Sequence, residues 1–124
     1  MVQFPKKEKL CSKKEIESLF ANGQSILEPP FRIIWNFEKN NENVFLKCLI
    51  IVSKKKIKLA VDRNLLKRRI REAYRVNKKK LESFLENSNR RLNLAIIYQK
   101  EFFCDSKTLE QKINLLLTNL IDEL

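Results

Sequence analysis

The sequence predicts an α+β sandwich in which helices pack on a mixed β-sheet. Stretches rich in β-branched and aromatic residues alternate with amphipathic helical patterns, and hydrophobic residues make up 44% of the 124-residue chain. A long helical pattern also separates two strand patterns, which implies a crossover and parallel pairing. The expected order is α-β-β-α-β-α, with a βαβ crossover, in one domain spanning residues 1–124.

The N-terminal part of the chain predicts an arm followed by a short helix. Residues 1–9 are basic and lack periodicity, so we expect a mobile arm. A capping box then starts the helix, with Ser12 as the N-cap and Glu15 three residues later. The apolar residues that follow share one face, and Gly23 is predicted to end the helix in the left-handed conformation.

Two strands are expected next. Residues 31–37 are rich in aromatic and β-branched side chains, and the Pro29-Pro30 pair before them cannot be helical. Residues 44–52 are almost continuously apolar, which favours a central strand. The polar residues 39–43 between the two segments predict a hairpin that pairs them.

A long amphipathic helix follows, with Asp62 as the expected N-cap and residues 87–89 as its end. At about 100° per residue, one arc of this helix is apolar apart from Asn77. The members of this arc are Leu66, Ile70, Ala73, Tyr74, Asn77, Leu81 and Phe84. Residues 92–98 predict a third strand, and Asp105 or Ser106 should cap a last helix. Its buried face is expected to comprise Leu109, Ile113, Leu116, Leu117 and Leu120.

Positive charge is concentrated in one segment of the chain. Residues 54–80 contain 13 of the 26 lysines and arginines and only two acidic residues, so their net charge of +11 equals that of the whole protein. A charge that served only solubility would be distributed along the sequence, whereas a surface that binds a polyanion concentrates it. The segment therefore predicts nucleic-acid binding.

Composition excludes several classes of function. The absence of histidine excludes His-based acid–base catalysis, Ser-His and Cys-His nucleophilic pairs and the usual zinc sites. A single glycine leaves no Gly-rich phosphate loop. Three cysteines without CxxC spacing indicate a reducing compartment, and no apolar stretch is long enough for a membrane span. We expect a cytoplasmic protein with no catalytic residue, metal site, small-molecule substrate or membrane contact.

The densest functional signal is the arginine-rich segment at residues 63–75. Guanidinium groups engage phosphate oxygens bidentately and remain charged at cellular pH. Spacings of three and four residues align Arg68, Arg71 and Arg75 along a helix, where successive phosphates of a nucleic-acid backbone could bind. A merely solvated face would mix charges of both signs. Only Glu72 is acidic in this segment, so binding is favoured over that alternative.

The same segment resembles the signature of the bacterial ribonuclease P protein family. That signature begins with Arg-Asn, and two variable residues separate this pair from Lys-Arg. Two further variable residues separate Lys-Arg from an arginine, which is followed by an acidic or amide residue. The resemblance covers residues 52–56 and 60–75, and more weakly residues 4–6, 20–23 and the element order. It implies the protein subunit of a ribozyme endonuclease that removes 5′ leaders from precursor tRNA. It also implies a fold akin to a ribosomal-protein domain, with a left-handed β-α-β crossover.

The resemblance further implies partners, cofactors and site residues. The partners would be the catalytic RNA subunit and precursor tRNA, and the RNA would require Mg²⁺ while the protein itself would bind no cofactor. The residues facing the RNA subunit would be Arg63, Asn64, Lys67, Arg68, Arg69, Arg71 and Arg75. The single-stranded leader would lie in a cleft between the first helix and the sheet. The residues along it would be Phe20, Phe31, Ile33, Trp35, Lys54, Lys55 and Lys56.

Departures from the family and rival interpretations stay open at this point. Ile16 stands where many relatives carry phenylalanine, and residues 57–59 lack a common glycine. The aromatic residues of the predicted cleft could simply be core. Composition alone equally fits a ribosomal-type RNA-binding protein without nuclease function. A DNA-binding regulator is disfavoured because no short Gly-containing helix-turn-helix is present, and a protein-only nuclease because histidine and clustered carboxylates are lacking.

Overall fold

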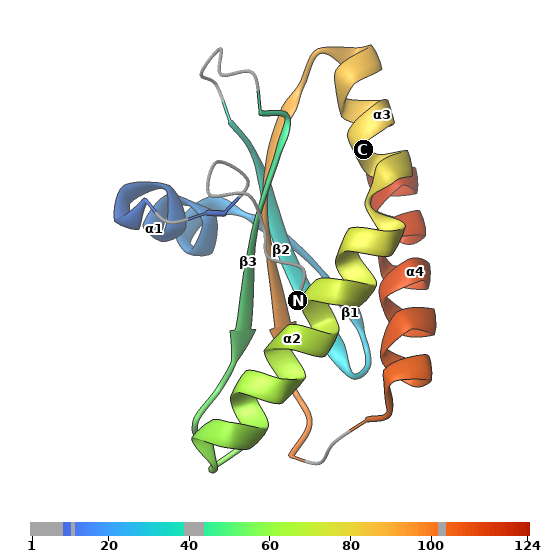
Figure 1. Ribbon diagram of the computed structural model, residues 1–124. Helices are drawn as coiled ribbons and strands as arrows, with labels where there is room; N and C mark the ends of the chain where they lie inside the picture. The colour runs from blue at the N-terminus through green and yellow to red at the C-terminus, as the bar shows by residue number, and fades with distance from the viewer. Residues whose placement is uncertain (1–8, 11, 39–43, 102–103) are drawn as a thin grey trace.

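The computed structural model describes residues 9–10, 12–38, 44–101 and 104–124, so most of the predicted arm lies outside the described residues. It has three layers, with one helix on one face of a sheet and the other helices on the opposite face (Figure 1). The predicted α+β sandwich is confirmed. The helices are α1 (Lys13–Asn22), α2 (Ala60–Asn77), α3 (Lys79–Ser88) and α4 (Ser106–Glu123).

The sheet has the strand order β1-β2-β4-β3. Its strands are β1 (Gln24–Glu28), β2 (Phe31–Glu38), β3 (Leu46–Val52) and β4 (Arg91–Tyr98). The predicted hairpin between β2 and β3 is wrong, because β4 lies between them and pairs antiparallel with β2 and parallel with β3. The physical reason is burial: β4 is the most continuously buried strand and takes the central position that we expected for β3.

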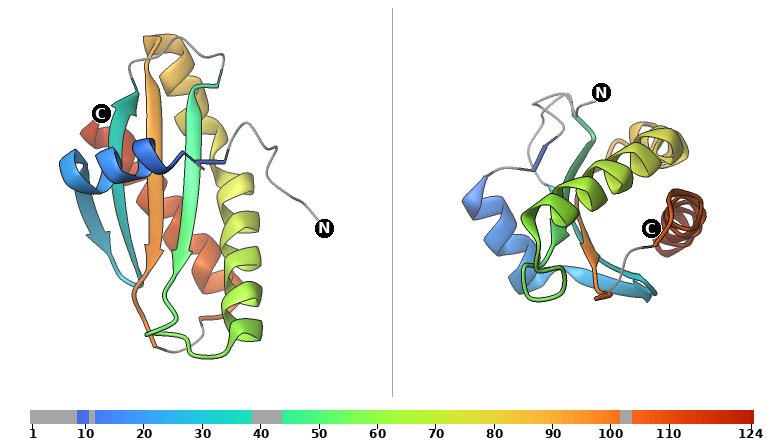
Figure 2. Two further views of the ribbon diagram at one scale, coloured as in Figure 1. Left: turned by 90° about the vertical axis from the view of Figure 1, so that its left-hand side faces the viewer. Right: turned by 60° about the horizontal axis from the view of Figure 1, so that its bottom comes forward.

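The connection from β3 to β4 passes through α2 and α3 on one face of the sheet, and the predicted parallel pairing is confirmed. In Figure 2 both strands run in the same direction, and the crossover has the left-handed sense that the resemblance implies. This sense is rare among βαβ units. It places α2 beside the edge strand β3 rather than over the centre of the sheet (Figure 2).

Strand β1 is an element that the sequence analysis missed. It pairs with β2 through the two-residue turn Pro29–Pro30, with Glu28 opposite Phe31. The prediction that Gly23 adopts the left-handed conformation is also wrong, since its φ of −73° and ψ of 153° are extended and lead directly into β1. Glycine is needed there for space, because a Cβ would overlap the carbonyl oxygen of Leu19 and lie 2.6 Å from Cγ2 of Ile34.

The long helix differs from its prediction at its start and in its middle. It begins at Ala60 after Leu59, with no side-chain cap, so Asp62 lies in the first turn and is not the N-cap. It is also divided at Lys78 into α2 and α3, and the Asn77 side chain donates a hydrogen bond to the carbonyl oxygen of Ala73 (2.8 Å) just before the division. By contrast, the predicted caps at Ser12 and Asp105 are confirmed.

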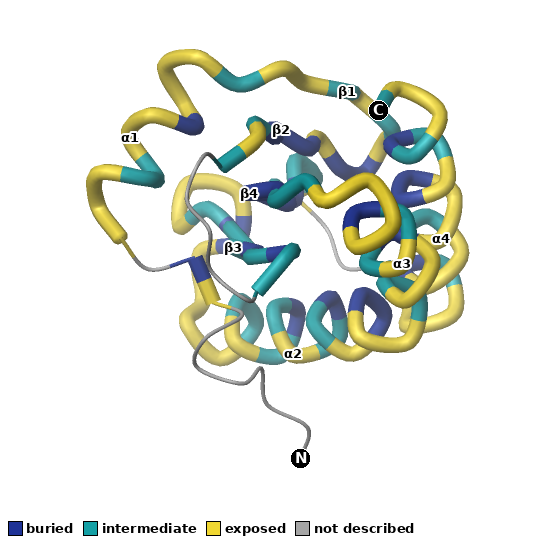
Figure 3. Tube along the Cα trace, turned by 90° about the horizontal axis from the view of Figure 1, so that it is seen from above, coloured by how far each residue is buried: buried dark blue, intermediate teal, exposed yellow. Residues whose placement is uncertain are grey.

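Two cores of unequal size lie on the two faces of the sheet (Figure 3). The larger core fills the space between the sheet and helices α2, α3 and α4, and includes the whole predicted apolar face of α4. The smaller core lies under α1, and its buried members among the described residues are Leu10, Leu19, Ile34 and Ala95. Because α1 covers little of its face, that side of the sheet is open at the margins of the helix.

Candidate nucleic-acid interface

Helix α2 lies between the edge strand β3 and α4 and presents its remaining surface outward (Figure 1). Its buried stripe consists of Leu66, Ile70, Ala73 and Tyr74, as the helical periodicity predicts. Six of the 13 basic residues of the +11 segment lie on other sides of α2, which holds them on a rigid element at one edge of the molecule. The other seven lie in the connector before α2 and at residues 78–80. Such a surface binds polyanions through electrostatic attraction and counterion release.

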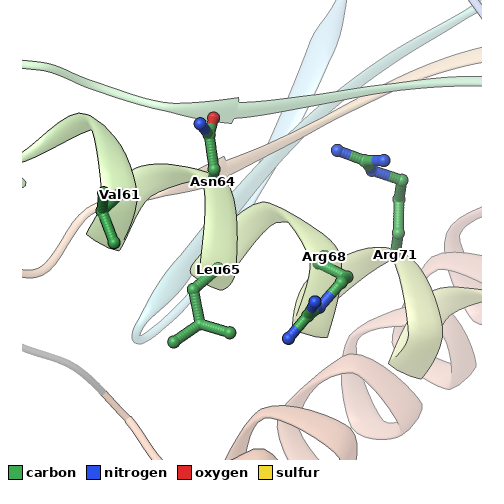
Figure 4. A pocket seen from close by; sticks show the side chains of 5 residues that line it. All are labelled: Val61, Asn64, Leu65, Arg68 and Arg71. Carbon is green, nitrogen blue, oxygen red and sulfur yellow. The ribbon is translucent and has the colours of Figure 1, made fainter. Parts of the chain in front are cut away.

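Three predicted RNA-contacting residues lie together on the outer face of α2. Asn64, Arg68 and Arg71 line a shallow depression of about 520 Å³ together with Val61 and Leu65 (Figure 4). Among the described residues, the structure gives the two guanidinium groups no hydrogen-bond or ion-pair partner. Unpaired guanidinium groups are available for phosphate oxygens without first breaking an internal contact.

A second depression, of about 220 Å³, continues this surface around the edge of the sheet. Lys67 and Arg71 of α2 border it on one side, and Lys9 and Leu10 on the other. Leu10 donates a backbone hydrogen bond to the carbonyl oxygen of Cys48 (3.1 Å), which holds Lys9 and Leu10 along the edge of β3. Lys9 thereby joins a basic surface that sequence reasoning did not assign to it.

The other predicted RNA-contacting arginines make internal contacts. Arg63 donates from Nη1 to the carbonyl oxygens of Ile57 (3.0 Å) and Lys58 (2.8 Å). Arg75 is paired with Glu72 at 2.6 Å, a hydrogen bond that raises the pKa of Arg75 and lowers that of the carboxyl. Arg69 lies on the side of α2 that faces Asp105. Hydrogen bonds from Thr108 and, more weakly, the charges of Lys107 and Arg69 lower the pKa of Asp105.

We expect Arg63→Ala to reduce stability rather than RNA affinity. Loss of its two bonds to the carbonyls of residues 57 and 58 should lower the free energy of unfolding by about 1–2 kcal/mol, because a charged donor is removed from a partly buried site. Urea denaturation would measure this, with Arg68→Ala as the control that leaves stability unchanged. A variant as stable as wild type with weakened RNA binding would contradict the structural role.

The predicted lysines of the cleft edge, Lys54, Lys55 and Lys56, are exposed in the connector before α2. Lys55 and Lys56 line a depression of about 420 Å³ with the start of α2, and Lys56 lies 3.9 Å from Glu101. This depression contains no residue of α1. The structure therefore groups these two lysines with the start of α2 rather than with the cleft.

The prediction that Phe31, Ile33 and Trp35 line the cleft under α1 is wrong. They are 0%, 0% and 3% exposed and belong to the large core on the opposite face. Successive residues of a strand point to opposite faces, so Ile34 is the β2 residue that packs under α1. Phe20 differs from these three, because it is 46% exposed and remains available for a stacked base.

Sequence reasoning missed a polar group beside α1. Asn36 of β2 and Asn93 of β4 are directly paired, and both line a depression of about 470 Å³ bordered by Ser12, Glu15 and Glu38. Asn93 is 2% exposed and donates from its side-chain amide to Glu38 (3.0 Å). The side-chain oxygens of both asparagines have no hydrogen-bond partner among the described residues. Unpaired buried acceptors call for a donor. The available signal was a polar residue interrupting each apolar strand.

Within the described ranges, no three acidic or cysteine side chains gather where they could hold a metal ion. In the same part of the chain, no helix combines the length and apolarity needed to cross a membrane.

The fold and the basic helix define the class of this protein as a small α+β protein with a basic surface of the kind that binds nucleic acid. The family model described as Ribonuclease P matches residues 4–120. The chain is 30% identical over 106 residues to the ribonuclease P protein component of Porphyromonas gingivalis, covering 86% of this chain and 77% of that protein. It is 31% identical over 125 residues to that of Chlorobium phaeobacteroides, covering 93% and 86%.

Solved structures show the same fold. The RNase P protein from Thermotoga maritima superposes with a TM-score of 0.67 at 24% identity, covering 94% of this chain and 97% of that one. A mutant RNase P protein from Staphylococcus aureus gives a TM-score of 0.70 at 20% identity, covering 93% and 89%. The chain belongs to the ribonuclease P protein family, the accessory subunits of the endoribonuclease that processes tRNA. This membership decides against the ribosomal-type alternative.

Proposed function

We propose that the outer face of α2 binds the catalytic RNA subunit and that the cleft beside α1 binds the 5′ leader of precursor tRNA. The observation that carries the proposal is the outer face of α2, in the middle of the +11 segment, where Arg68 and Arg71 are unpaired among the described residues. The protein would lower the repulsion between the two RNAs and strengthen binding of substrate and of the Mg²⁺ that the RNA uses. Hydrolysis would belong to the RNA subunit.

The cleft differs chemically from the α2 surface. Its lining includes the amide oxygens of Asn36 and Asn93, which attract hydrogen-bond donors. It also holds two carboxylates, Glu15 and Glu38, which repel phosphate, and one lysine, Lys14. A leader strand would therefore direct base edges toward these oxygens and keep its backbone outside. Phe20 also lies on α1 but outside the lining of this cleft, and its exposed ring would stack against a base of the leader beyond it.

The direct test is cleavage of precursor tRNA at low Mg²⁺ by a bacterial ribonuclease P RNA, with and without this protein. We expect correct 5′ maturation that requires both components. Tight, salt-sensitive RNA binding with no stimulation by a cognate RNA subunit would contradict the proposal.

Phe20→Ala is expected to weaken the binding of leader-bearing precursor tRNA to the holoenzyme by roughly fivefold to tenfold, because one stacked base is lost. Binding of leaderless tRNA should not change. Equilibrium binding at low Mg²⁺ would measure both. Leu115→Ala is the matched control, since Leu115 is exposed to a similar degree but lies on α4, on the other side of the sheet. Equal losses for both tRNAs would contradict the assignment of Phe20 to the leader.

A further inference from the structure

Helix α2 carries apolar surface that the core does not use. Val61 is 76% exposed, and Leu59 just before the helix is 66% exposed. Leu65 is half-buried and lies one turn after Val61 on the same side of the helix. A helix face that served only solubility would carry polar side chains at these positions. Here the apolar surface stands at the start of the most basic segment of the chain.

The apolar and basic side chains together form one shallow depression, of about 520 Å³. In Figure 4, Asn64 and Arg71 point to one side of the helix, and Leu65 and Arg68 point to the other. Among the described residues, the structure gives the Asn64 amide no hydrogen-bond partner, and the two guanidinium groups are likewise unpaired. The depression thus combines aliphatic side chains and one guanidinium group on one side with an amide and the second guanidinium group on the other.

We propose that this depression binds one unstacked nucleobase of the catalytic RNA subunit. The inference rests on the proposed function, in which α2 faces that RNA. The aliphatic groups of Val61 and Leu65 cover one face of the base, and the Asn64 amide meets its edge. Arg68 and Arg71 bind the phosphates on either side of the nucleotide. A nucleotide is the ligand that joins a flat, weakly hydrated ring to flanking anions, as this combination of side chains requires.

Charge complementarity selects RNA over the other candidate occupants. A second copy of the chain would bring two +11 segments together, and their repulsion opposes such a dimer. An uncharged apolar partner would leave the guanidinium groups facing it without a counterion.

The test compares a double variant, Val61→Ser with Leu65→Ser, against a matched control, Leu27→Ser with Leu115→Ser. The control also removes two exposed aliphatic side chains, but from β1 and α4, outside α2. One readout is the affinity for ribonuclease P RNA. A second is the affinity for a single-stranded RNA 12-mer and for an abasic 12-mer of equal charge. Val61→Ser alone repeats the test at the most exposed position should the double variant fail to fold.

We expect the double variant to lose roughly fivefold in affinity for ribonuclease P RNA and for the base-bearing oligomer. Its affinity for the abasic oligomer and its salt dependence should match those of wild type, and the control should match wild type throughout. Equal losses on both oligomers would overturn the inference, as would a loss on the oligomer without one on ribonuclease P RNA. A change in self-association, measured by sedimentation, would overturn it in favour of a second copy. Failure of the wild type to bind any of these RNAs would instead overturn the proposed function.

Discussion

Replacing Arg68 and Arg71 together by alanine is expected to weaken binding to ribonuclease P RNA by roughly tenfold to a hundredfold at low salt. Both guanidinium groups border the outer depression of α2, and neither has a partner among the described residues. Their removal should therefore cost the protein no internal contact. The double substitution should therefore lower RNA affinity and leave the free energy of unfolding unchanged.

The salt dependence of RNA affinity shows whether the weaker binding comes from lost phosphate contacts. Each lost phosphate contact removes ~0.9 from the slope of log affinity against log salt concentration on double-stranded nucleic acid, so the double variant should lower that slope by about two. Fluorescence anisotropy titrations at several salt concentrations would measure it. Lys107→Ala with Lys112→Ala removes the same charge from α4 and serves as the control. A reduced affinity with an unchanged slope would show that these arginines do not contact phosphate.

Gly23→Ala is expected to lower the free energy of unfolding by about 1–3 kcal/mol, because the added methyl group overpacks the junction between α1 and β2. The backbone conformation at this position suits any residue, so the cost is steric. The methyl group would overlap the Leu19 carbonyl oxygen, which already accepts the amide hydrogen of Gly23 at 2.8 Å, and would press on Ile34. Helix α1 would have to move away from the sheet.

The consequence should extend to the leader. Because α1 forms one wall of the proposed cleft, its displacement should weaken binding of leader-bearing precursor tRNA more than binding of ribonuclease P RNA to α2. Denaturation and the two binding measurements would separate these effects. Asn22→Ala, at the exposed end of α1, is the control and should change stability by less than about 0.5 kcal/mol. A stable Gly23→Ala protein would show that α1 adjusts without cost.

The two surfaces that we propose to bind RNA have different origins in the chain. The α2 surface is contiguous in sequence, because side chains three and four residues apart in a helix share a side. The cleft beside α1 draws on α1, β2 and β4, which are far apart in the sequence and meet only when the sheet forms. The first surface could be located by reading along the chain, whereas the second could not.

The sequence by itself determined the helix caps at Ser12 and Asp105, the buried face of α4, the parallel βαβ unit and the basic helix that carries the family signature. These features depend on local spacing and composition, which a single chain displays directly. The tertiary structure alone decided that β4 separates β2 from β3, that Asn36 and Asn93 meet beside α1, and that Trp35 belongs to the larger core. In a strand that is apolar on both faces, alternation cannot show which face will meet which layer. Pairing between distant strands has no local signal either, so both are settled only by packing.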